Sequence, residues 1–181
     1  SARDAYNDPG APVYETRPDG TRVMYQDGDW IYLAADGACE TGDRPRLDRF
    51  NLQTREKVNL FQARADCLER FVAFGSAGRE TIITRYESKT EPPNYILVDL
   101  PAQKRVPLTD FKDPAPQLTG LKKELVKYAR ADGTPLSGTL YLPPGYAAGT
   151  KLPLVIWAYP LEYSDPATAG QVRGSPNSFT F

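Results

Sequence analysis

The chain has 181 residues, enough for one ordinary domain or for parts of two. Its 23 acidic and 22 basic residues nearly cancel, and no basic stripe follows the chain, which argues against nucleic acid as a partner. It contains no histidine, the usual general base of serine and cysteine hydrolases and a common zinc ligand, so a self-contained enzyme of those classes is disfavoured.

The first 110 residues consist of short strand-like runs separated by turn residues. An Asp27-Gly28-Asp29 turn between residues 22–26 and 30–34 predicts a β-hairpin, because Asp-Gly between apolar or β-branched runs is a strong hairpin signal. Three further hairpins are predicted over residues 49–61, 70–86 and 95–108. The regular turns and the lack of a helical period favour an all-β sandwich, barrel or propeller.

The pattern changes at Asp113-Pro114-Ala115-Pro116, which predicts a linker because proline restricts the residue before it and removes a backbone donor. A fifth hairpin is predicted over residues 124–142. Residues 152–160 are then apolar without alternation, which indicates a strand covered on both faces, as in an α/β sheet. No helix follows to complete a parallel βαβ unit.

Two features that suggest chemistry are interpreted as structural. Cys39 and Cys67 are too few for a disulfide scaffold, so we interpret them as free or partly buried thiols, with pairing in an oxidising compartment as the alternative. Residues 74–78 approach a Gly-x-Ser-x-Gly nucleophile elbow, but Phe74 stands where the first glycine is required. This motif also falls between two predicted antiparallel strands, so we interpret it as a hairpin loop.

Beyond the linker, the sequence resembles the opening of the hydrolase domain of prolyl oligopeptidase-type serine peptidases. The resemblance is carried by Asp132-Gly133, Leu140-Tyr141-Leu142-Pro143-Pro144-Gly145-Tyr146 and Leu152-Pro153-Leu154-Val155-Ile156-Trp157-Ala158-Tyr159-Pro160. Two more motifs resemble the glutamyl endopeptidase-like subgroup: Glu91-Pro92-Pro93-Asn94-Tyr95 and Ala169-Gly170-Gln171-Val172-Arg173-Gly174-Ser175-Pro176-Asn177. The resemblance is good over residues 85–181 and weak over the N-terminal third.

The resemblance implies a mainly β chain made of parts of two domains. Residues 1–114 would be the C-terminal blades of a β-propeller, and residues 115–181 the first strands of an α/β-hydrolase domain. The parent protein would hydrolyse peptide bonds by Ser-His-Asp acyl transfer, with the triad beyond Phe181, so the 181-residue chain alone is expected to be inactive. Substrates would be mostly peptides, because the family's propeller keeps folded proteins from the active site.

The resemblance also implies candidate site residues. The loop after residues 154–158 supplies an oxyanion-hole donor in this family, and the alignment of the prolines leaves Tyr159 and Trp157 as the two candidates. Arg173 is a candidate for binding an acidic substrate side chain, and Glu162 for binding a peptide amino terminus. The alternatives are a packing role for the two aromatics, a structural ion pair or solvated surface position for Arg173, and a solvated position for Glu162.

No metal or organic cofactor is implied. The longest apolar run, at residues 154–159, is too short for a membrane span. An incomplete hydrolase sheet would need the remainder of its own domain as a partner, or self-associate. Subgroup resemblance favours a bacterial envelope or secreted enzyme. Two other function classes remain open: a non-catalytic β-rich module that binds peptide or sugar, and a carboxylate-based glycoside hydrolase.

Overall fold

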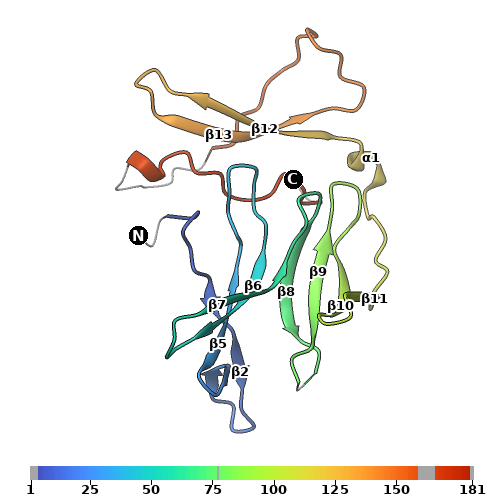
Figure 1. Ribbon diagram of the computed structural model, residues 1–181. Coiled ribbons are helices and arrows are strands. Elements are labelled where there is room, and N and C mark those ends of the chain that lie inside the picture. Colours follow the sequence, from blue (N-terminus) through green and yellow to red (C-terminus); the bar gives the residue numbers. More distant parts are fainter. Residues whose placement is uncertain (1–3, 77, 159–165, 180–181) are drawn as a thin grey trace.

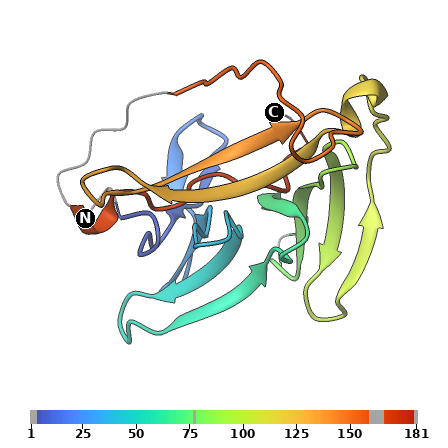
Figure 2. The same cartoon turned by 90° about the horizontal axis from the view of Figure 1, so that it is seen from above.

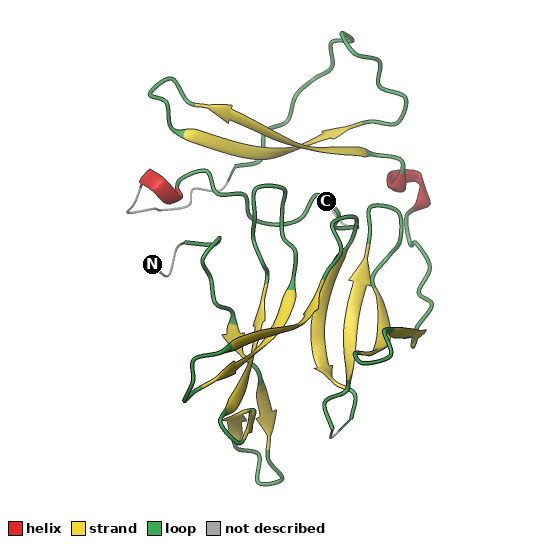
Figure 3. Cartoon of the chain, viewed as in Figure 1, coloured by secondary structure: helices red, strands yellow, loops and turns green. Residues whose placement is uncertain are grey.

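The computed structural model describes residues 4–76, 78–158 and 166–179. This part of the chain is mainly β, as the sequence predicts, and folds into four antiparallel sheets, none of which closes on itself (Figure 3). Its helices are two short segments, α1 (Pro116–Thr119) and the 3-10 turn η1 (Pro166–Thr168). Neither of these described helices is long and apolar enough to cross a membrane.

The first large sheet contains the strand order β1-β5-β6-β7, with β4 also paired to β5. Its strands are β1 (Ala11–Pro12), β4 (Gln26–Asp27), β5 (Trp30–Ala35), β6 (Arg46–Asn51) and β7 (Lys57–Gln62). The predicted hairpin around Gly28 forms, but of its predicted first strand, residues 22–26, only the end that belongs to β4 pairs with β5. Residues 22–24 pair elsewhere, because the Tyr25 amide donates to the Val13 carbonyl (2.8 Å) and aligns β3 (Arg22–Met24) with β2 (Tyr14–Thr16).

The second large sheet is a simple meander in the order β11-β10-β9-β8. Its strands are β8 (Leu68–Phe74), β9 (Thr81–Glu87), β10 (Asn94–Asp99) and β11 (Lys104–Pro107). The elbow-like motif at residues 74–78 falls in the loop between β8 and β9, as predicted, and the Gly75 amide donates to the Thr81 carbonyl (2.9 Å). The serine of this motif therefore lies in a hairpin turn rather than between a strand and a helix.

The core lies between these two sheets. Tyr32 and Leu47 of the first sheet and Ile82 and Val98 of the second form one buried cluster. Phe74 packs its ring 5.0 Å from that of Tyr32, in an edge-to-face arrangement. The cluster therefore joins residues that are up to 66 positions apart in sequence, Tyr32 and Val98, and it makes the two sheets one packed unit.

Replacing Leu47 by alanine tests this junction. Its side chain is fully buried, so the substitution is expected to destabilise the paired sheets by about 2–5 kcal/mol through lost burial and the cavity left behind. Urea unfolding followed by the fluorescence of Trp30 measures the loss. Val72→Ala is the control, because Val72 is half-exposed on β8 and its truncation should barely shift the midpoint. An equal shift in both variants would contradict a core between the sheets.

A long hairpin of β12 (Lys122–Ala129) and β13 (Pro135–Leu142) lies across one end of the two large sheets (Figures 1 and 2). Its turn is the predicted Asp132-Gly133: Gly133 has φ +83°, and the Arg130 amide donates to the Thr134 carbonyl (2.9 Å). α1 and the loop before it join this hairpin to β11, at the position where the proline-rich segment predicts a linker.

The apolar run after the hairpin does not form the predicted strand. Residues 151–158 have no regular secondary structure, and Leu154, Val155, Ile156 and Trp157 are 73%, 88%, 77% and 91% exposed. A strand is stable only when a neighbouring strand takes up its backbone hydrogen bonds, and no described segment lies beside this run as a partner. The sequence predicted the apolar character correctly and the pairing wrongly.

Both cysteines are free thiols, as interpreted from the sequence. The half-buried Cys39 contacts the Gly42 carbonyl through Sγ at 2.9 Å. Cys67 is buried, and burial raises the pKa of its thiol. Cys67 is therefore protonated and unreactive near neutral pH.

Candidate functional site

A segment near the C-terminal end, residues 169–179, passes between the hairpin β12–β13 and the ends of the two large sheets (Figure 1). We call this segment the strap. It contains the motif that resembles the glutamyl endopeptidase-like subgroup. It is held along its length by hydrogen bonds to residues distant in sequence: Asp4 and Ala5, Tyr6, Asp43, Ala65, Glu87 and Lys123.

The centre of the strap is fixed to the loop between β5 and β6. The Asp43 amide donates to the Gly174 carbonyl (2.8 Å), and the Gly174 amide donates to Asp43 Oδ1 (3.1 Å). Arg70 Nη2 lies 3.6 Å from Asp43 Oδ2. Burial raises the pKa of Asp43, and Asp36 raises it further, while Arg70, the Gly174 hydrogen bond and Arg173 oppose the rise. Asp43 thus acts mainly as an acceptor that orients the strap.

Arg173 lies at a cavity of about 380 Å³ on this side of the strap. Four carboxylates line the same cavity, those of Asp4, Asp8, Asp36 and Asp43. Among the described residues, no three His, Cys, Asp or Glu side chains are grouped closely enough to hold a metal ion. Burial raises the pKa of Asp43 and the positive charge of Arg173 opposes that rise, so the two groups interact electrostatically. The role of Arg173 in binding an acidic substrate side chain stays a prediction.

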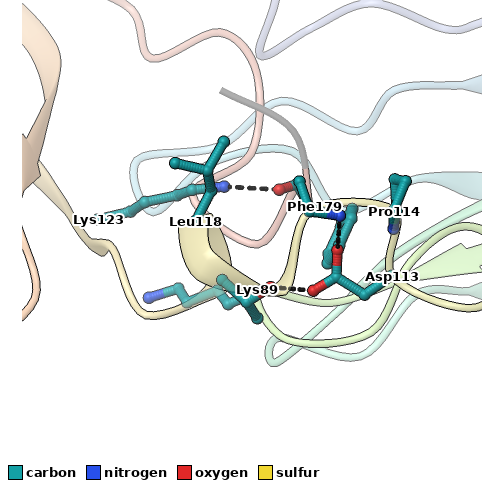
Figure 4. A pocket seen from close by; sticks show the side chains of 8 residues that line it. Lys89, Asp113, Pro114, Leu118, Lys123 and Phe179 are labelled. Carbon is teal, nitrogen blue, oxygen red and sulfur yellow. Dashed lines mark hydrogen bonds between the residues drawn. The ribbon is translucent and has the colours of Figure 1, made fainter.

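The end of the strap is held by two buried charged residues from different sheets. Lys123 of β12 donates through Nζ to the carbonyls of Ser178 (2.7 Å) and Phe179 (3.1 Å) (Figure 4). Glu87 of β9 accepts the Phe179 amide at 2.8 Å through Oε2 and Arg85 Nη1 at 2.6 Å through Oε1. Lys123 is 7% exposed to solvent and Glu87 is 3% exposed. Burial lowers the pKa of Lys123, and the charge of Glu87 opposes that effect.

A small, mostly apolar cavity of about 200 Å³ adjoins this contact. Figure 4 shows Leu118, Pro114 and Phe179 around it, so it is formed jointly by the linker and the strap. Asp113 is engaged within the linker, since it accepts the Ala115 amide at 2.8 Å and the Thr119 hydroxyl. The linker, the hairpin and the strap therefore meet at one point above β9.

Of the two candidate oxyanion-hole donors, the structure describes Trp157 but not Tyr159. Trp157 is almost fully exposed in a segment without regular structure, so it is not packed as an ordinary core aromatic among the described residues. Tyr159 lies outside the described residues, as does Glu162. Arg173 lies in the strap, and its role beside the other three candidates stays a prediction.

Asp43, Glu87 and Lys123 were missed by sequence reasoning. Each is a charged residue that is buried, and burial of a charge depends on partners that come from distant segments. For Lys123 the sequence holds one indication of burial, because Lys123 lies on the same face of its strand as the apolar Leu125, two residues on. For Asp43 and Glu87 no local pattern predicts burial.

Comparison with known proteins identifies the relatives of this chain, although no family model matches it. It is 40% identical over 195 aligned positions to a probable chloroplastic glutamyl endopeptidase of Oryza sativa subsp. japonica, and 38% identical over 196 to the protein of the same name from Arabidopsis thaliana. Each alignment covers 99% of this chain. This chain belongs to the glutamyl endopeptidase-like group of the prolyl oligopeptidase family.

The glutamyl endopeptidase-like chain spans about a fifth of these relatives, 21% and 20% of their lengths. Among solved structures, it is similar to a variant of the AtxE2 isopeptidase with Astexin3-dC4 bound and to the apo form of AtxE2, with TM-scores of 0.48 and 0.44. Both are 20% identical to it, covering 90% and 78% of this chain and 25% and 23% of theirs. The resemblance that the motifs indicate is thus confirmed by sequence over nearly the whole chain, including the weak N-terminal third.

Proposed function

We propose that this chain is the junction between the propeller and the hydrolase domain of a serine peptidase. Residues 1–114 would be the last propeller blades and residues 115–181 the opening of the α/β-hydrolase domain. The observation that carries the proposal is the alignment of nearly the whole chain with a fifth of two probable glutamyl endopeptidases. A peptide is the substrate class that follows from it.

The sheets support the propeller part of this proposal. A propeller blade is a sheet of four antiparallel strands, and successive blades pack face to face around an axis. Strands β8 to β11 form such a four-stranded meander, and the sheet containing β4 to β7 packs against it through the Leu47 and Ile82 cluster. Two neighbouring blades would have this strand order and this contact.

The exposed apolar run supports the hydrolase part. Residues 152–157 are too apolar to remain in water in a working protein, because a continuous exposed apolar patch marks an interaction site. Neighbouring strands of the hydrolase sheet would take up its backbone hydrogen bonds, and helices would cover both of its faces. Without them, a preparation of the 181-residue chain would self-associate through this run.

The proposed chemistry is acyl transfer by a serine, a histidine and an aspartate beyond Phe181. In that reaction the serine attacks the peptide carbonyl, the histidine takes its proton and returns it to the leaving amine, and the aspartate orients the histidine. This chain would supply an oxyanion-hole donor, Tyr159 or Trp157, and part of the wall of the substrate cavity through Arg173 and Glu162. Such a donor stabilises the charge of the tetrahedral intermediate.

The experiment compares the full-length protein with the 181-residue chain on a panel of chromogenic peptides, with the intact mass of each sample measured. We expect the full-length protein to hydrolyse peptides and to lose activity after labelling by a serine-directed fluorophosphonate. We expect the 181-residue chain to show no hydrolysis above buffer. Hydrolysis by the 181-residue chain that survives the serine reagent would reject the proposal and favour a carboxylate-based hydrolase. Peptide binding without hydrolysis by the full-length protein would favour a binding module.

A further inference from the structure

We propose that Glu87 and Lys123 are positioning residues that lock the strap between the second large sheet and the hairpin, and thereby set the shape of the substrate cavity. The inference rests on the proposed function, since it concerns how a substrate-side segment is held. Neither residue would touch the reacting atoms. Their role is to fix the backbone of Phe179, and through it the neighbouring strap residues.

The geometry at Phe179 is a two-sided backbone clamp. Its amide is bound from the sheet by Glu87, and its carbonyl is bound from the hairpin by Lys123. The two partners carry opposite charges, and each holds the backbone group that suits its own sign. Hydrogen bonds to charged groups are stronger than those between neutral groups, and more so in a dry environment. A clamp built in this way resists displacement of the strap in either direction.

The clamp also joins two parts of the fold that otherwise share few connections. Glu87 ends β9, and Lys123 lies near the beginning of β12, on the far side of the linker. Charged side chains are rarely buried to this degree unless they are paired or fully hydrogen-bonded. Glu87 also pairs with Arg85 on its own strand, but its hydrogen bond to Phe179, like those of Lys123, forms only when the strap is in place.

The other anchors of the strap lie at Gln171, Val172, Gly174 and Asn177, which bind Asp4 and Ala5, Tyr6, Asp43 and Ala65 in turn. The Phe179 clamp is therefore the last of several anchors along the strap. Loss of the Phe179 clamp would free one end and leave the other attached, so the strap would shift locally while both large sheets stay folded. We expect such a shift to weaken substrate binding more than the chemical step, because the reacting groups are held elsewhere.

The test uses the full-length protein with Glu87→Met and Lys123→Met. Hydrogen exchange of peptides covering residues 174–179 is measured by mass spectrometry, together with KM and kcat on one chromogenic peptide. We expect exchange in this segment to accelerate by about tenfold or more, with KM raised by roughly tenfold and kcat changed by less than about threefold. Lys123→Arg should restore slow exchange, because a guanidinium can donate to both carbonyls.

Lys122→Met is the matched control, since Lys122 is the adjacent residue but its side chain is 68% exposed and pairs with Glu124 on its own strand. It should leave both exchange and KM unchanged. Unaltered exchange at residues 174–179 in Lys123→Met would overturn the inference, and so would accelerated exchange spread evenly over both large sheets. If the full-length protein hydrolyses no peptide, the proposed function fails, while the exchange measurement still decides whether the clamp exists.

Discussion

Replacing Asp48 by alanine is expected to destabilise the first large sheet by about 3–5 kcal/mol. Asp48 lies on β6 and is 1% exposed. Its carboxylate accepts Asn59 Nδ2 at 2.8 Å and pairs with Arg46 Nε and Lys57 Nζ, both at 2.9 Å. Removing it leaves two cations close together without the anion that balances them. Urea titration of the variant, followed by Trp30 on the neighbouring strand, measures the loss.

Asp66→Ala is a suitable control, because Asp66 also pairs with an arginine, Arg64 at 3.0 Å, but is 71% exposed. Water screens that pair, so its removal should have little effect on unfolding. Similar losses from the two substitutions would show that burial of Asp48 contributes nothing beyond a surface ion pair.

Asp48 should also give the sheet an acid-sensitive stability. Burial by itself would raise the pKa of Asp48, but the hydrogen bonds from Asn59, Lys57 and Arg46 outweigh it, and the pKa is lowered. A carboxyl whose folded pKa is below its unfolded value of about 3.9 stabilises the fold above that pH, and the contribution is lost as the pH falls through the folded value. Asp48→Asn should therefore lose less stability than the natural chain between about pH 4 and pH 2. If the unfolding free energies of Asp48→Asn and of the natural chain fell in parallel over this pH range, a lowered pKa of Asp48 would be contradicted.

In the full-length protein, Tyr159→Phe is expected to lower kcat by about 10² to 10³ with little change in KM. The phenol is proposed to donate a hydrogen bond to the oxyanion of the tetrahedral intermediate, and this charge is absent from the bound substrate. Phenylalanine keeps the ring and removes the donor, so only the transition state should lose stabilisation. Steady-state kinetics on a chromogenic peptide give both constants.

Trp157→Phe separates the two candidate donors. If Tyr159 supplies the hydroxyl, Trp157→Phe should leave kcat within a few-fold, and the reverse result would assign the role to the indole N–H of Trp157. A normal kcat in both variants would remove this loop from the oxyanion hole. Circular dichroism of each variant checks that the fold is retained.

Local turn chemistry explains why most of the strands could be predicted from the sequence. The hairpins at Gly28, at residues 52–56, at Gly75, at Pro101 and at Gly133 all form where turn residues separate β-branched or apolar runs. The exception shows the limit of that reasoning. Residues 22–24 have the right composition for the Gly28 hairpin, but a hydrogen bond from Tyr25 to Val13 directs them to another partner.

The candidate site was less accessible to sequence reasoning, because its geometry comes from long-range contacts. The motif at residues 169–177 carries the family resemblance, yet nothing in its sequence shows that Gly174 contacts Asp43 or that Asn177 contacts Ala65. The strand predicted over residues 154–158 failed for a related reason. Composition predicts how apolar a segment is, whereas pairing depends on a neighbour that must be present.

The strap has a consequence for the order in which the chain acquires its structure during synthesis. Tyr6 binds Val172 and Ala5 binds Gln171, across 166 residues in each case. A ribosome releases the first of these partners long before the second, and closing so long a loop is entropically costly. The two meanders, whose contacts are local, can form as they emerge. Residues 4–6 therefore stay without these partners, open to proteases and chaperones, until the strap has been synthesised.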